Sequence, residues 1–142
     1  MLFRSGKDIV SSQFSFDPDD LAYIHNHYIY LDHDQTYTAS GGVSYKFQSD
    51  SALDGLKLGV DALYGSGLRA DGAVPNGREL PGYATVNLSA SYRLAGPGIA
   101  IRFDVINVGD HVYEIRDGTG IGVGAPQYGA RRGFFVGLSK DL

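Results

Sequence analysis

The 142-residue sequence contains no cysteine, a single methionine and no excess of basic residues. Because cysteine is absent, a disulfide scaffold, a thiolate zinc site and a cysteine nucleophile are all excluded. Lysine and arginine number 12 against 16 aspartate and glutamate residues, which gives a formal net charge of −4. Phosphate binding requires a basic surface, so we expect no nucleic acid partner.

Long hydrophobic runs are also absent. No stretch approaches the roughly 18 consecutive apolar residues of a transmembrane helix, and residues 1–8 lack the apolar segment of a signal peptide. The length is that of one domain, and a hydrophobic content of 43% is not that of a disordered chain. Glycine, with 20 residues, and tyrosine, with 10, are abundant, and this composition favours an all-β chain.

Apolar and polar residues alternate along five segments, at residues 34–47, 56–69, 81–94, 99 to about 113, and 134–142. A period of two places successive side chains on opposite faces of a strand, so each segment is predicted to be a strand. In the third segment, for example, Val86 and Leu88 fall on the apolar face and Asn87 and Ser89 on the polar face. A sixth, weaker strand is predicted at residues 9–16.

Short and long connections alternate between these segments. Residues 48–55 and 95–98 form short polar turns, whereas residues 17–33, 70–80 and 114–128 form longer loops. Bacterial outer-membrane barrels have short periplasmic turns and long extracellular loops. In a barrel of that kind the two turns are expected in the periplasm and the three loops outside. Within the first loop, Asp17 followed by Pro18 predicts one or two helical turns.

Three observations favour lipid as the environment of the apolar face. The polar face carries mainly serine, threonine, glycine and asparagine, with less charge than water-facing strands usually have. Tyr37, Tyr64 and Tyr92 lie near the ends of apolar rows, like the aromatic girdles of outer-membrane barrels. The ten steps from Tyr37 to Phe47 span about 33 Å, and a tilt near 40° reduces this to about 25 Å, the height of a transmembrane apolar band. A soluble, lipocalin-like barrel is the alternative.

Several segments together resemble TonB-dependent receptors, and the resemblance covers nearly the whole chain. Residues 102–110 are similar to the family's Asn-Leu-Phe-Asp turn, with Val108 and Gly109 in place of leucine and phenylalanine. The family usually ends on two aromatic residues spaced by one position, where this chain has Lys140 and Leu142. The other similar segments are residues 32–35, 63–69, 77–89, 113–114 and 131–139.

The resemblance implies an all-β fold of antiparallel transmembrane β-barrel strands, about six here, that belong to a larger 22-stranded barrel. Residues 1–142 would be the C-terminal portion of that barrel, without the plug domain and without the segment that contacts TonB. The implied function is part of an outer-membrane receptor of a Gram-negative bacterium, which imports a scarce nutrient such as a ferric siderophore, cobalamin or a carbohydrate. Its implied partners are outer-membrane lipid, the plug domain, the remaining strands and the TonB complex, which supplies the energy.

A small stand-alone barrel is the alternative function, either a minor porin or a soluble ligand binder. An in-frame plug domain upstream would favour the receptor, and a signal peptide directly before Gly6 would favour the small barrel. An enzyme is not expected, because no spacing typical of a catalytic triad or of a nucleophile elbow is present.

Three patterns superficially indicate other sites. Gly120-x-Gly122-x-x-Ala125 fits a dinucleotide fingerprint, but it lacks the strand before and the helix after that such a site requires. Asp61, Arg102 and Asp104 share the polar face, where we expect them to pair across neighbouring strands. Loop residues that suggest a metal site but lack the helical spacing of zinc enzymes are His25, His27, Asp32, His33 and Asp34. We therefore predict no catalytic, cofactor-binding or metal-binding residues, and no cofactor.

Overall fold

The computed structural model describes residues 18–30, 34–48, 53–70, 78–94, 96, 98–118 and 124–140. The chain divides into two units. The sheet unit comprises residues 38–64, 84–112 and 130–142, and the loop unit comprises residues 1–37, 65–83 and 113–129. Each unit is described by itself.

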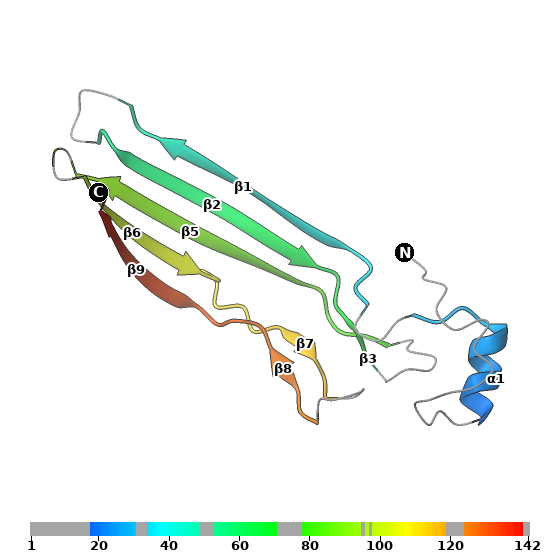
Figure 1. Cartoon of the computed structure of the whole chain (residues 1–142). Coiled ribbons are helices and arrows are strands. Elements are labelled where there is room, and N and C mark those ends of the chain that lie inside the picture. The colour runs from blue at the N-terminus through cyan, green and yellow to red at the C-terminus, as the bar shows by residue number, and fades with distance from the viewer. Residues whose placement is uncertain are drawn as a thin grey trace. The chain divides into compact units, whose positions relative to one another are not determined.

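Five long strands form one sheet in which each strand lies beside the next long strand along the chain (Figure 1). Their order is β1-β2-β5-β6-β9, so β1 and β9 are its two edges. The predicted strand segments are thereby confirmed, because four of them contain one of these strands and the fifth, residues 134–142, covers all of β9 except Gly133. The strands are β1 (Thr38–Lys46), β2 (Leu56–Gly65), β5 (Tyr83–Arg93), β6 (Ile99–Ile106) and β9 (Gly133–Lys140).

The fourth strand is shorter than predicted. It ends at Ile106 instead of near Tyr113, because the chain turns at Asn107 and Asp110, whose φ angles are 47° and 50°. These left-handed conformations are incompatible with a continuing strand, and the Asp110 amide donates a hydrogen bond to the Asn107 carbonyl at 2.8 Å. The weaker strand predicted at residues 9–16 lies outside the described residues.

Short strand pairs are found at two of the predicted long loops. At residues 70–80, β3 (Arg69–Ala70), which begins one residue before the loop, pairs antiparallel with β4 (Arg78–Glu79). At residues 114–128, β7 (Glu114–Arg116) pairs antiparallel with β8 (Gln127–Tyr128), with an irregularity in β7. Strands of two or three residues are too short for the alternation of apolar and polar residues to indicate them.

The predicted helical turns are confirmed as α1 (Pro18–Asn26), which begins on the proline. Asp19 and Asp20 lie in its first turn, where the helix dipole favours negative charge, and His25 lies in its last turn. Among the described residues, no helix is both long enough and apolar enough to cross a membrane.

The loop unit contains the buried apolar side chains. The buried hydrophobic residues are Ile24, Ile29, Ala70 and Leu80, and all four belong to this unit. Among the described residues of the sheet unit, by contrast, only Thr85 and Asn107 are buried, and both are polar. The sheet unit therefore has no apolar core of the usual kind.

Tyrosine rings lie over glycines in the loop unit. The rings of Tyr83 and Tyr113 stack with their centroids 4.3 Å apart. A Cβ atom at Gly65 would lie 2.6 Å from the Tyr83 ring, and one at Gly129 would lie 1.9 Å from the Tyr113 ring. These two glycines are required because any side chain at either position would displace an aromatic ring.

Candidate functional site

The sheet has an apolar face on which side chains from neighbouring strands form continuous rows. Leu88 lies opposite Val105, and Val105 lies opposite Phe134. The next row joins Ala90, Phe103 and Val136, whose register follows from the same pairings. The apolar face thus extends across β5, β6 and β9 without interruption by a charged side chain in these rows.

Side chains of the apolar face are widely exposed. Val136 and Leu138 are 77% and 75% exposed, and Val43 and Tyr45 are 68% and 65% exposed. Monomeric soluble proteins rarely expose contiguous apolar surface of this kind, because its contact with water is unfavourable. Tyr45 packs edge-to-face against Phe47, with ring centroids 4.9 Å apart, at one end of the β1 row. Tyr37 lies at the other end.

The opposite face of the sheet is polar, and small side chains form its floor. A hollow of about 230 Å³ is lined by residues that include Gly42, Ser44, Gly59 and Ser89. A Cβ atom at Gly59 would lie 2.5 Å from the Ser89 hydroxyl, and one at Gly42 would lie 2.9 Å from the Asp61 Cβ. These contacts confirm that the predicted polar residues of β1, β2 and β5 share one face.

Charged residues of the polar face are held by local contacts. The Arg102 Nε atom lies 2.7 Å from the Asp104 Oδ2 atom, two positions further along the same strand. Asp61 on β2 instead accepts a hydrogen bond of 2.6 Å from the Asn87 amide on β5. The expected pairing across neighbouring strands is therefore confirmed for Asp61, through a hydrogen bond, and wrong for Arg102 and Asp104. Arg102 reaches Asp104 within β6 because residues i and i+2 of a strand point to the same side.

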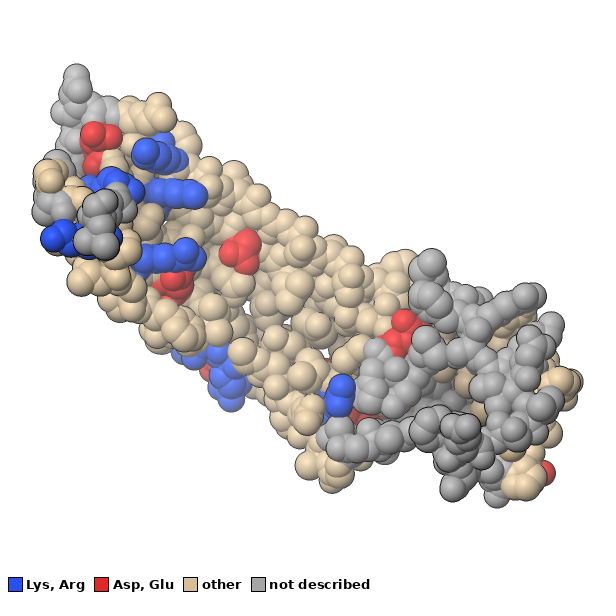
Figure 2. All heavy atoms as spheres, in the orientation of Figure 1, with Lys and Arg blue, Asp and Glu red and all other residues tan. Residues whose placement is uncertain are grey.

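Lysine and arginine side chains gather at the end of this face where the β1–β2 and β5–β6 turns lie (Figure 2, upper left). Lys57, near the start of β2, lines one hollow with Lys46 at the end of β1 and another with Arg102 of β6. The first of these hollows, of about 620 Å³, is also lined by Arg93 and Asp54. The polar face is consequently most basic near these turns.

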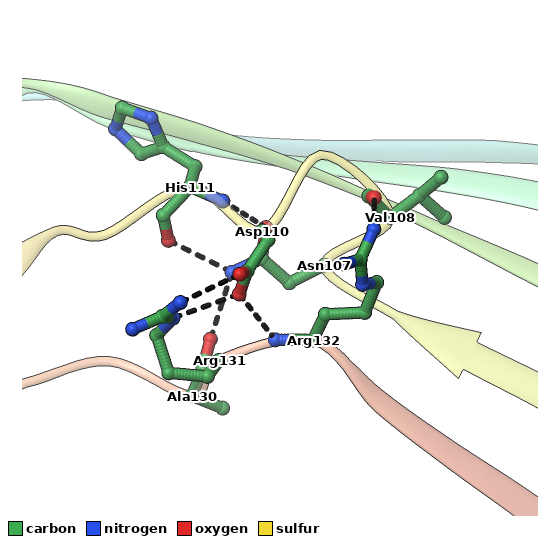
Figure 3. Close-up of polar contacts among 7 residues, drawn as sticks. All are labelled: Asn107, Val108, Asp110, His111, Ala130, Arg131 and Arg132. Atoms are coloured by element: carbon green, nitrogen blue, oxygen red, sulfur yellow. Dashed lines mark hydrogen bonds and ion pairs between the residues drawn. The ribbon is translucent and has the colours of Figure 1, made fainter.

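Asn107 is the centre of a hydrogen-bonded junction at the opposite end of β6, where the chain leaves the sheet and later returns (Figure 3). Its side-chain amide donates to the His111 carbonyl at 2.8 Å and to the Ala130 carbonyl at 2.9 Å, and its Oδ1 atom accepts from the His111 amide. Its own backbone amide donates to the Asn87 side chain at 2.8 Å. Asn107 is 3% exposed, so these bonds satisfy an otherwise costly buried amide.

Asp110 and Arg131 close the same junction with a bidentate ion pair. The Arg131 Nε and Nη2 atoms lie 2.7 and 2.6 Å from the two carboxylate oxygens of Asp110. The Arg132 backbone amide donates to the same carboxylate at 3.0 Å. The Arg131 hydrogen bonds are the main cause that holds the pKa of Asp110 well below its usual range.

The residues that suggested metal or nucleotide sites are not brought together in the described part of the chain. His27 stacks on Tyr23, with ring centroids 4.2 Å apart, and His25 is exposed on α1. Asp32, His33, Gly120 and Gly122 lie outside the described residues. Among the residues that the structure does describe, no three His, Asp or Glu side chains lie close enough together to hold a metal ion.

A family model for the β-barrel of TonB-dependent receptor-like proteins matches residues 9–108. The matched range includes β1, β2, β5 and β6 and most of the polar face. The chain belongs to this family. Its members are outer-membrane proteins of Gram-negative bacteria and are transporters, not enzymes. No curated protein matches the sequence.

Membership of this family assigns the two faces of the sheet. In transmembrane β-barrels of the outer membrane the apolar face contacts lipid and the polar face lines the interior. The exposed rows through Leu88 and Ala90 are therefore lipid-facing, and the surface around Ser89, Asn87 and Asp61 is the inner wall.

Sequence reasoning missed two features of this wall. Alternation places Lys46 and Lys57 on the polar sides of their strands, but their direct juxtaposition depends on the pairing register of β1 and β2, which alternation alone does not provide. The Asn107 junction was hidden within a predicted strand. The similarity of residues 102–110 to a known turn was the signal that could have revealed it.

Proposed function

We propose that the chain is the C-terminal portion of an outer-membrane receptor barrel that imports a scarce nutrient with energy supplied through TonB. The family match and the lipid-facing apolar rows support an outer-membrane transporter. The nutrient class is a ferric siderophore, cobalamin or a carbohydrate. The localisation that follows is the outer membrane of a Gram-negative bacterium.

The open sheet is the observation that carries the proposal of a larger barrel. Within the described residues, β1 pairs only with β2 and β9 pairs only with β6, so the sheet has two unpaired edges. An edge in hydrocarbon leaves backbone N–H and C=O groups without partners, at a cost of several kcal/mol for each group. Outer-membrane barrels avoid this cost by closing with at least about eight strands. We infer that further strands of the receptor complete the barrel on both edges.

The inner wall and the loops would have different tasks. The polar face, from Lys46 to Asp61, would contact the plug domain inside the barrel, since its side chains are small or hydrogen-bonding. The segments beyond the Asn107 junction would lie outside the cell and contact the nutrient. The TonB complex would act through the N-terminal part of the receptor.

Uptake in whole cells tests this function. Cells that express the receptor containing this chain are given a panel of radiolabelled ferric siderophores, cobalamin and oligosaccharides, with and without a protonophore. The proposal predicts uptake of one class that stops when the proton gradient is collapsed or when TonB is deleted. Uptake that continues without the gradient would instead indicate a passive pore, and uptake of no compound would count against a transporter of these nutrients.

A further inference from the structure

A row of side chains crosses four strands of the polar face, and three of its four members are cationic. The Phe47 amide donates to the Leu56 carbonyl at 2.8 Å, and this register places Lys46 on β1 directly opposite Lys57 on β2. The Arg93 amide donates to the Gly55 carbonyl at 3.2 Å, which places Lys57 opposite Ser91 on β5. Ser91 in turn pairs with Arg102 on β6. We call Lys46, Lys57, Ser91 and Arg102 the basic row.

The charge of the basic row is only partly neutralised. Asp104 pairs with Arg102 at 2.7 Å, whereas the side chains of Lys46 and Lys57 have no hydrogen bond or ion pair within the described part of the chain. Like charges directly opposite on neighbouring strands repel each other. The Lys46–Lys57 pair therefore destabilises the sheet unless an anion lies over it. Asp54 lines the adjoining hollow together with both lysines.

The side chains next to the basic row are small on three of the four strands. The neighbouring row consists of Ser44, Gly59 and Ser89 on β1, β2 and β5, and it ends on β6 at Asp104, the partner of Arg102. Gly42 lies one row further on β1. A second hollow of about 120 Å³ connects this floor to the basic row, because Ser44, Ser89, Lys57 and Arg102 all line it. A floor of glycine and serine lets a polypeptide backbone approach closely, while the longer lysine and arginine side chains reach over its edge.

We propose that the basic row binds an extended polypeptide segment that carries acidic side chains at alternate positions. Neighbouring strands lie about 4.8 Å apart, so the cations of the row are distributed over about 14 Å. Alternate residues of an extended segment are about 6.6 Å apart, and two or three carboxylates therefore match the length of the row. A single phosphate would contact at most two of the cations, since they form a line and do not converge on one point.

This inference rests on the proposed function, which places the row inside the barrel and makes a segment of the plug domain the natural occupant. Its test is independent of transport. The 142-residue chain is folded in detergent micelles, and its β-structure is checked by circular dichroism. Fluorescence anisotropy then measures binding of a labelled eight-residue peptide in which aspartate alternates with serine. A peptide with asparagine in place of aspartate serves as the neutral probe.

Removal of the two lysines gives the decisive comparison. We expect Lys46→Gln combined with Lys57→Gln to weaken binding of the acidic peptide about tenfold, the effect of losing two partly exposed ion pairs. The matched control is Lys140→Gln, which removes a charge from β9 on the apolar side, two positions from Leu138, and leaves binding unchanged. If the double variant loses β-structure, peptide binding is compared for Lys46→Gln alone, because Lys46 lies on the edge strand.

Charge reversal provides a gain of binding as the second readout. Lys46→Glu combined with Lys57→Glu is expected to abolish binding of the acidic peptide and to create binding of a peptide in which lysine alternates with serine. Absence of acidic-peptide binding to the folded chain, or an equal effect of Lys140→Gln, would overturn the inference. Competition by millimolar inorganic phosphate would overturn it in favour of a small-anion site. None of these outcomes would affect the uptake result, so the two proposals fail separately.

Discussion

The two units of the chain bury opposite kinds of side chain. In the loop unit Ile24 and Leu80 are 2% and 4% exposed, as in a water-soluble protein. In the sheet unit Val136 and Leu138 are largely exposed, whereas Asn107 is buried and fully hydrogen-bonded. The loop unit is thus stabilised by removal of apolar surface from water, and the sheet unit by backbone hydrogen bonds within an apolar solvent. The loop unit is therefore suited to water and the sheet unit to lipid.

The largest effect should come from removal of the apolar solvent. We expect the purified chain to aggregate when detergent is withdrawn, because the apolar rows and both sheet edges are then exposed to water. Size-exclusion chromatography with and without detergent measures this directly. A sharp monomeric peak in detergent-free buffer, together with a cooperative thermal melt, would contradict the lipid-facing assignment and favour a soluble barrel.

A charge placed on each face should sharpen the comparison within the sheet. Leu88 lies at the middle of β5 on the apolar face, so Leu88→Arg should lower the free energy of unfolding in lipid by about 2–4 kcal/mol. The matched variant Ser89→Arg, on the polar face, should cost much less because its guanidinium can reach water. Urea titration of both variants in lipid vesicles compares them. Equal losses would mean that the two faces are not in different solvents.

The Asn107 junction should show how the sheet unit depends on a buried polar group. Asn107→Ala leaves the His111 and Ala130 backbone groups without their partner, and it places alanine at a φ of 47°. We expect a loss of about 1–3 kcal/mol in the free energy of unfolding.

Asn107→Gly separates the two causes, because glycine adopts the left-handed conformation without strain but lacks the amide. It should be milder than alanine by about 1 kcal/mol. A glycine variant as stable as the wild type would show that the hydrogen bonds contribute nothing, contrary to this account.

The Asp110–Arg131 ion pair should give the smallest effect, a local dependence on pH. Because the pKa of Asp110 is lowered in the folded chain, its stabilising contribution is complete above its unfolded value of about 3.9 and is lost as the pH falls below it. The protection of the amides at residues 107–111 and 130–132 against hydrogen exchange, taken relative to the intrinsic exchange rate at each pH, should therefore fall below about pH 4. In the Asp110→Asn control this acid-dependent loss of protection should be absent.

The strands were largely predictable from the sequence, because apolar and polar residues alternate along them with the period of two that a strand requires. In β5 this alternation extends over the whole length. The helix at Pro18 was predictable for a similarly local reason, the fixed φ of proline after an aspartate. Alternation alone did not reveal the end of β6, because it does not report the hydrogen bonds that hold Asn107, to His111 nearby and to Ala130 far away in the sequence.

The polar face was predictable as a face, but its contacts were not. Alternation assigns Lys46, Lys57 and Arg102 to one side of their strands, whereas the row they form depends on the register of three strand pairs. Arg102 was expected to find its partner across strands, but the residues directly opposite it are Ser91 and Gly137, which carry no charge. It pairs instead with Asp104, two positions further along the same side of β6.

The orientation of β5 is the central claim, and single cysteines test it most directly because the chain contains none of its own. Leu88→Cys and Ser89→Cys are labelled with an environment-sensitive fluorophore in cells that carry the receptor in their outer membrane, and a lipid-soluble quencher is added. We predict quenching at position 88 and none at position 89. The reverse result would show that the inner and outer faces are exchanged, and quenching at neither position would show that β5 does not cross the membrane.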